Sequence, residues 1–351
     1  MAHRIAGALS GERHVLACVL ILMSINLLAF GTFANGYDVT WTLITMQTCA
    51  LIWVFGLAMR TSFPDVPGLY VFESVALTTT IGIQAAFATA TLAPMGGDYA
   101  DGALAAADAI LVPFVGWPQA VGWLVDHPAL FRLCNFVYTS INWQAPLLVL
   151  LLALTGDGRT LRVITLAAGL SAIIGLTIFA FMPAQGAYIH HGFQRSDLPD
   201  LMVGLPFDFP IVLAALRDGS MDMLSSDSIS GLISFPSFHA ASAIMLSIAW
   251  ARFGKSAIPM HVLNAGVALS AIPIGSHYFT DILGGLALGV FSMRMASHVT
   301  REPGDDRAAQ DRCPARLHVR TIHPGECRPA ALRHLHRGHP LQHIIQERST
   351  T

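Results

Sequence analysis

Two histidines and an aspartate in the C-terminal half of this 351-residue chain have the types and spacing of a reaction centre. His277 and Asp281 lie four residues apart in GSHYFTDILGG, and positions i and i+4 share one face of a helix. Asp281 can therefore accept a hydrogen bond from Nδ1 of His277, which leaves Nε2 free as a nucleophile or base. His239 begins another apolar run, in GLISFPSFHAASAIML.

A simpler interpretation of each residue alone stays open. A single histidine at a membrane surface is often only solvated, and Ser237 is a suitable N-terminal cap for a helix without any chemical role. The joint arrangement of His239, His277 and Asp281 favours a reaction centre over that interpretation.

The elements that must position these residues are membrane helices. The chain is 54% hydrophobic and 12% charged, with a mean hydropathy of +0.56, a balance typical of a polytopic membrane protein. Apolar runs of about 20 residues, enough to cross a hydrocarbon core, recur along it. They predict an all-α membrane helix bundle of eight spans, at about 14–36, 40–60, 69–93, 133–155, 160–182, 236–253, 256–274 and 277–297.

Two stretches between the spans carry other expectations. Residues 103–128 are apolar but contain Pro113, Pro118 and two tryptophans, so we expect a helix lying at the membrane interface, where Trp is favoured. The longest hydrophilic insertion, 183–232, is too long for a turn. The pattern DFPIVLAALRDG within it predicts a short helix.

Charge predicts the orientation of the bundle. With the N-terminus in the cytoplasm, most basic residues of the short loops fall inside, as the positive-inside rule requires. The inner set is Arg4, Arg13, Arg60, Arg159, Arg162, Arg252, Lys255 and Arg294, against Arg132, Arg195 and Arg217 outside. Both histidines then lie at the outer surface. One lysine among twenty Lys and Arg residues hints at a GC-rich bacterial genome, so we expect a multi-pass protein of the cell inner membrane whose site faces the periplasm or the extracellular side.

The chain changes composition after Met295. Residues 298–351 are rich in Arg, His and Pro without periodicity, and we expect a disordered cytoplasmic tail. Its cluster HLHRGHPLQH leaves metal binding open as an alternative. The five cysteines show no disulfide or zinc spacing, and we expect no metal, no cofactor and no nucleic-acid partner. The sequence does not indicate an oligomeric state.

The quoted motifs resemble the type 2 phosphatidic acid phosphatase (PAP2) superfamily, which includes lipid phosphate phosphatases and lipid phosphotransferases. Its signatures are a Pro-Ser-Gly-His element and a later Ser-Arg-x5-His-x3-Asp element. PSFH, residues 236–239, matches the first with Phe238 in place of glycine. The second is matched, with Ala271 in place of arginine, by Ser270, His277 and Asp281. FPSFHAA and HYFTDILGG look most like the branch of bacterial PAP2-like phosphatases and inositol phosphorylceramide synthases.

The resemblance implies a role for each residue. His277 would attack phosphorus to give a phosphohistidine, with Asp281 holding its tautomer. His239 would protonate the leaving oxygen and then activate water or an acceptor alcohol. Ser237 and the N–H groups at the start of its helix would bind the phosphoryl oxygens.

The chain departs from the family in its cations. Phosphoryl transfer needs positive charge around the equatorial oxygens. The family's Lys-x6-Arg-Pro element is absent, and the single lysine lies on the cytoplasmic side of the predicted topology. Arg217 and Arg195 are the expected replacements, with His190 and His191 as further candidates. For Arg217, a solvated loop arginine paired with Asp218 remains the alternative.

These features predict a phosphatidic acid phosphatase-type enzyme: a membrane lipid phosphate phosphatase that works through a phosphohistidine and takes a lipid phosphate from the bilayer. A lipid phosphotransferase of the inositol phosphorylceramide synthase kind remains an alternative. A membrane transport or structural protein with a decayed site is a more distant one, because family cations are missing. The resemblance implies a two-helix N-terminal extension, 1–68, before a six-helix PAP2-like core, 69–297.

Overall fold

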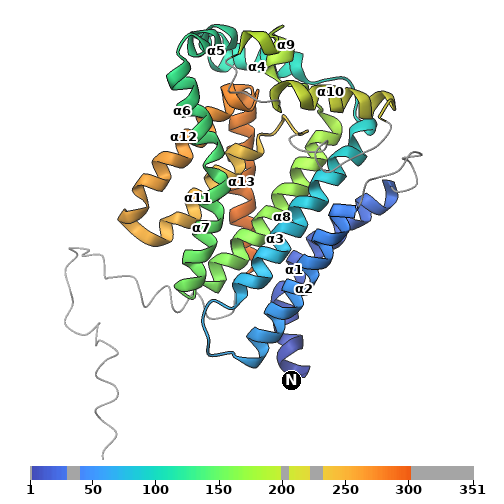
Figure 1. Cartoon of the computed structure of the whole chain (residues 1–351), viewed down its shortest axis with the longest axis vertical. Helices are drawn as coiled ribbons and strands as arrows, with labels where there is room; N and C mark the ends of the chain where they lie inside the picture. The colour runs from blue at the N-terminus through green and yellow to red at the C-terminus, as the bar shows by residue number, and fades with distance from the viewer. Residues whose placement is uncertain (1, 30–39, 199–204, 222–231, 302–351) are drawn as a thin grey trace, which may run out of the picture. The chain divides into compact units, whose positions relative to one another are not determined.

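The structure, a computed structural model, describes residues 2–29, 40–198, 205–221 and 232–301. Every regular element in these ranges is a helix, which confirms the predicted all-α class (Figure 1). The long helices are α1 (Ala2–Ala29), α2 (Thr40–Ser62), α3 (Tyr70–Leu92), α8 (Gly158–Phe181), α12 (Ile258–Ile274) and α13 (Phe279–Val299). The shorter ones are η1 (Ala93–Met95), α4 (Asp101–Leu111), α5 (Trp117–Val125), α6 (Pro128–Thr139), α7 (Ile141–Leu154), α9 (Ala187–His190), η2 (Arg195–Asp197), α10 (Leu205–Asp218), α11 (Phe238–Trp250) and η4 (Ala251–Ala257).

Seven segments of the described chain are long and apolar enough to cross a membrane, where the sequence predicts eight. The difference lies in one 37-residue segment, Phe238–Ile274. The chain turns back within it at Gly254, whose φ of 62° lies in the left-handed region that glycine tolerates. α11 and α12 pack side by side, and Ser247 Oγ lies 2.7 Å from Nδ1 of His261 across the pair. The predicted sixth and seventh spans therefore form a hairpin of two helices that are shorter than expected.

The segments between the spans differ from the prediction in one respect. The stretch expected to form a single interfacial helix forms two, α4 and α5, with Pro113 in the break and Pro118 in the first turn of α5. Neither is among the candidate spans. The short helix predicted within the insertion is present as α10. From residue 302 onward the predicted tail lies outside the described residues.

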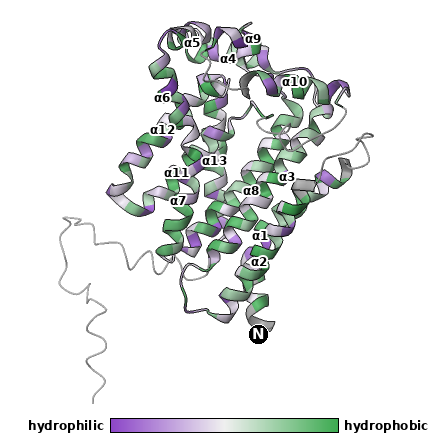
Figure 2. Ribbon diagram, in the orientation of Figure 1, coloured by the Kyte–Doolittle hydropathy of each residue, from purple (hydrophilic) through white to green (hydrophobic). Residues whose placement is uncertain are grey.

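Hydrophobic residues recur along the long helices (Figure 2), and many large apolar side chains are exposed on the outside of the bundle. Leu51 and Leu154 are 71% exposed and Val262 is 68% exposed. Lipid tails solvate such a surface, whereas water does not. The chain is thus a multi-pass membrane protein. Its short helices α4, α5 and α9 lie together at one end of the bundle, which we call the capped end (Figure 1).

The helices α3, α8, α13 and α11 pack in succession. Gly285 and Gly289 allow α13 to approach α11 closely: an added Cβ would lie 2.2 Å from the carbonyl oxygen of Ser237 and 2.5 Å from that of Ala241. Small residues four apart permit this kind of contact between membrane helices. The start of α11 is therefore pressed against the first turns of α13.

A buried ion cluster joins α1 and α2 to α3. Arg60 of α2 binds Glu12 of α1 at 2.5 Å and Glu73 of α3 at 2.7 Å. Both carboxylates are buried, and Trp53 also donates to Glu12. Charges inside a membrane bundle require partners of this kind, so the cluster fixes the N-terminal helices to the rest.

Asp157 caps the N-terminus of α8. Its carboxylate accepts bonds from Thr160 N at 3.0 Å, Thr160 Oγ1 at 2.8 Å and Arg252 Nε at 2.8 Å. Partial burial opposes ionisation, but the hydrogen bonds from Thr160 and Arg252 outweigh it and lower the pKa of Asp157.

Asp157→Ala should lower the free energy of unfolding by about 1 kcal/mol, the usual loss for an N-cap, as measured by thermal unfolding in detergent. Because the folded pKa lies below the ordinary value of 3.8, the contribution is present above that value and is lost as pH falls through the lowered pKa. Asp65→Ala, in an exposed turn, is the matched control. Equal losses in both variants would contradict the cap.

Candidate active site

The first histidine lies in the first turn of α11. Ser237 precedes the helix in an extended conformation, and its hydroxyl accepts a bond of 3.4 Å from Ala240 N, so it is the N-cap that the sequence allows. Nδ1 of His239 lies 3.0 Å from the hydroxyl of Tyr138 on α6. The two rings stack with their centroids 3.9 Å apart, which fixes the plane of the imidazole.

His277 and Asp281 meet as predicted, but not on one helical face. α13 begins at Phe279, so His277 precedes the helix and Asp281 lies in its first turn. Nδ1 of His277 lies 3.2 Å from Oδ2 of Asp281. The same oxygen accepts bonds from Tyr278 N at 3.0 Å and Ser234 Oγ at 3.2 Å. The predicted helix start at 277 is thus two residues early, and the aspartate orients the ring from a capping position.

The two histidine-bearing segments are joined through the backbone. Ser237 N donates to the carbonyl oxygen of Asp281 at 3.1 Å. This bond places the first turn of α11, which carries His239, against the first turn of α13, which follows His277. His277 is 4% exposed and Asp281 fully buried, and Oδ1 of Asp281 has no hydrogen-bond partner among the described residues. The structure therefore brings together the three predicted catalytic residues and Ser237.

Asp108 of α4 holds the start of α13. Its carboxylate accepts bonds from Phe279 N at 2.8 Å, Thr280 N at 2.7 Å and Thr280 Oγ1 at 2.6 Å. A carboxylate at a helix N-terminus satisfies free N–H groups and complements the helix dipole. Asp108 thereby fixes the backbone two residues after His277.

Asp101, seven residues earlier on the same helix, holds the other side of this segment. It accepts bonds from Gln185 N at 2.8 Å, Gly186 N at 2.9 Å and the Tyr278 hydroxyl at 3.0 Å. Burial, together with the nearby Asp101, raises the pKa of Tyr278, so its hydroxyl remains a donor. Asp101 therefore ties the segment before α9 to the residue that follows His277.

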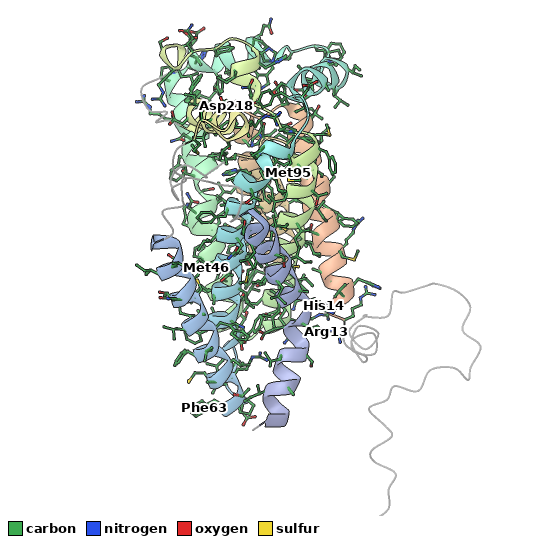
Figure 3. The ribbon with its side chains drawn as sticks, turned by 90° about the vertical axis from the view of Figure 1, so that its right-hand side faces the viewer. Arg13, His14, Met46, Phe63, Met95 and Asp218 are labelled. Atoms are coloured by element: carbon green, nitrogen blue, oxygen red, sulfur yellow. The ribbon has the colours of Figure 1, made fainter. Side chains whose placement is uncertain are left out.

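The predicted phosphate-binding Arg217 has other partners. Its guanidinium donates to main-chain carbonyls of the 93–97 turn at 3.3, 3.3 and 2.5 Å and lies over the ring of Tyr99. Figure 3 labels Met95, which lies in the 93–97 turn, and Asp218, the residue after Arg217. Asp218 itself accepts a bond from Ser220 N at 2.8 Å.

Arg195 pairs with Asp208 at 2.7 Å, with both side chains largely exposed. Ala271, which stands where the family has arginine, is fully buried and offers no charge. Within the described ranges, no group of three or more His, Cys, Asp or Glu side chains is arranged to hold a metal ion. None of these contacts therefore identifies a positively charged ligand for a phosphoryl group.

Sequence reasoning missed four residues of this site. No sequence pattern marks Tyr138 and Ser234, because they reach the histidines only through tertiary packing. Asp101 and Asp108 do carry one: they are seven residues apart, so they share a helix face. Two carboxylates on one face of an otherwise apolar helix indicate buried partners.

An all-helical membrane bundle with two imidazoles and a buried carboxylate at one end defines a membrane protein with a histidine-based candidate site. The family model described as the PAP2 superfamily matches residues 102–295, more than half of the chain. The chain belongs to this superfamily, whose members are generally phosphatases and phosphotransferases. The match includes every site residue above except Asp101. No solved structure matches the chain.

Asp108→Ala should lower the free energy of unfolding by about 1 kcal/mol, because the start of α13 loses its acceptor. Thermal unfolding of the purified protein measures the loss, with Asp126→Ala, exposed at the end of α5, as the control. Asp108→Asn keeps one acceptor oxygen and should recover part of the stability. A melting temperature for Asp108→Ala equal to that of the control would show that the carboxylate does not fasten α13.

Proposed function

We propose that this protein is a membrane lipid phosphate phosphatase that works through a phosphohistidine. The observation that carries the proposal is the His277–Asp281 contact, joined by the backbone bond from Ser237 to the helix that bears His239, in a chain that belongs to the PAP2 superfamily. FPSFHAA and HYFTDILGG support the branch of bacterial PAP2-like phosphatases and inositol phosphorylceramide synthases. The predicted charge asymmetry supports a site on the periplasmic or extracellular face of the cell inner membrane.

His277 is the proposed nucleophile. Its Nδ1–H donates to Asp281, so Nε2 presents a lone pair. Nε2 attacks phosphorus, a P–N bond forms, and the bond from phosphorus to the lipid oxygen breaks. The carboxylate stabilises the imidazolium that results. Nε2–H of protonated His239 gives its proton to the lipid oxygen, which leaves as an alcohol.

Tyr138 supports the role of His239 in both steps. In the proposed mechanism the tyrosine hydroxyl, 3.0 Å from Nδ1, accepts from Nδ1–H, so only Nε2 exchanges a proton with the substrate. In the second step Nε2 takes a proton from water, the oxygen of that water attacks phosphorus, and the P–N bond breaks. Inorganic phosphate leaves and both histidines return to their starting states.

The start of α11 is the proposed cradle for the phosphoryl oxygens. The Ser237 hydroxyl accepts from Ala240 N and retains its own proton for donation to the substrate. The helix dipole favours an anion there. Arg217 and Arg195 remain predictions as phosphate ligands, since they would first have to leave their carbonyl and Asp208 partners.

A groove beside the site supports a lipid substrate. It has a volume of about 640 Å³, lies between α5, α6 and α12, and is lined almost entirely by apolar side chains. This volume is in the usual range for ligand pockets. Its lining includes Val137 and Ser270, the sequence neighbours of Tyr138 and Ala271. A lipid arriving by lateral diffusion could place its tail there while its phosphate meets the histidines.

Purified protein should release inorganic phosphate from phosphatidic acid, and His277→Ala and His239→Ala should each reduce the rate by about 10²-fold or more. With labelled substrate, His277→Ala should form no covalent phosphoenzyme, whereas His239→Ala should form it slowly and also hydrolyse it slowly. The control is His127→Ala, an exposed histidine between α5 and α6. Equal rates for the wild type and both site variants would exclude the enzyme and favour a decayed site.

The acceptor is tested in the same assay. An added alcohol that becomes a labelled phosphoester would assign the transferase reaction, because an alcohol then resolves the phosphohistidine in place of water. Free phosphate as the only labelled product would assign the phosphatase.

A further inference from the structure

The segment that ends in α9 is fastened to the residues just before α13. Ala187 N donates to the carbonyl oxygen of Ser276 at 2.9 Å, and Tyr188 N donates to its hydroxyl at 3.1 Å. The Tyr188 hydroxyl donates to the carbonyl oxygen of Pro273 at 2.6 Å. α9 is therefore held against the residue next to His277.

Two histidines at the end of this segment lie beside the start of α13. The ring centroids of His190 and His191 are 6.1 and 6.3 Å from that of Tyr278. His191 stacks on Trp117 at 5.2 Å, and Nε1 of Trp117 donates to the carbonyl oxygen of His277 at 2.9 Å. His190 is exposed and His191 is half-buried.

The described side chains that bind the backbone around His277 are mainly carboxylates. Asp281, Asp101 and Asp108 all bind the backbone around it. Arg217 contacts main-chain carbonyls and Arg195 contacts Asp208. A phosphate dianion in this place needs cations to offset its charge.

We propose that His190 and His191 supply this charge by taking up a proton when a phosphate group binds. The inference rests on the proposed function, in which the anion is the phosphoryl group of the lipid. The proton comes from solvent, and the neutral imidazole becomes an imidazolium that donates to a phosphoryl oxygen. Phosphate binding and protonation are thus linked.

The groups around the pair set its charge before the anion arrives. Burial and the neighbouring His190 lower the pKa of His191, and Asp108 on α4 opposes them. The other titratable groups on elements around the pair are Asp101, Tyr278, Tyr188, His277, and Asp208 with Arg195. A lowered pKa leaves His191 neutral at neutral pH, and a bound dianion raises it again. Binding should therefore tighten as pH falls.

The test measures binding of micromolar tungstate, a tetrahedral dianion, to the full-length His277→Ala protein by calorimetry. This background removes one titrating histidine and makes the result independent of turnover. Affinity should rise roughly tenfold from about pH 8 to pH 6, with uptake of up to one proton. His190→Gln/His191→Gln should abolish the uptake and weaken binding at the lower pH about tenfold. His191→Arg should keep tight binding at the higher pH, which a purely structural role would not produce.

Three results would overturn the inference. The double glutamine variant could bind tungstate like its parent at both pH values. The parent could fail to bind at the lower pH. Finally, His127→Gln, at the same end of the bundle, could weaken binding as much as the double variant. A failure of the proposed function is detected in a different assay: the wild type would then release no phosphate from phosphatidic acid.

Discussion

The site depends on how closely α13 approaches α11. Gly285 and Gly289 leave no side chain between the two backbones, and Ser237 N then reaches the carbonyl oxygen of Asp281. This one contact fixes the relative position of His239, two residues beyond Ser237, and of His277. A larger residue at either glycine would move one histidine away from the other. The packing of α13 against α11 therefore also sets the distance between the two histidines.

The carboxylates at the capped end satisfy backbone groups before they meet any substrate. Asp281, Asp101 and Asp108 each accept at least one main-chain N–H from the segments that surround His277. A break between membrane helices leaves such groups without water, and their desolvation is unfavourable unless an acceptor lies nearby. The aspartates make an irregular segment at this depth possible. Their negative charge also explains why an anion site here needs an additional source of protons or cations.

The sequence predicts those features that local pattern determines. Apolar run length gives the helices, and motif spacing gives the His277–Asp281 contact and the Ser237 cap. It predicts the break near Gly254, between the spans 236–253 and 256–274, but not that α11 already ends at Trp250 and continues as the short helix η4. Nor does it predict Tyr138 on His239, or the carbonyl partners of Arg217, since these contacts join residues about 100 or more positions apart. The catalytic roles and the outward orientation remain predictions.

The shortness of α11 has a consequence for the surrounding lipid. Thirteen helical residues span about 20 Å, roughly 10 Å less than an average hydrocarbon core. Such hydrophobic mismatch is relieved by thinning the bilayer locally or by recessing the helix end. The short helices α4, α5 and α9 lie at the capped end of the bundle (Figure 1), so either adjustment would change the depth of His239 in the membrane. Bilayer thickness, which depends on the acyl chain length of the lipids, would then affect the position of His239 and so the rate of the reaction.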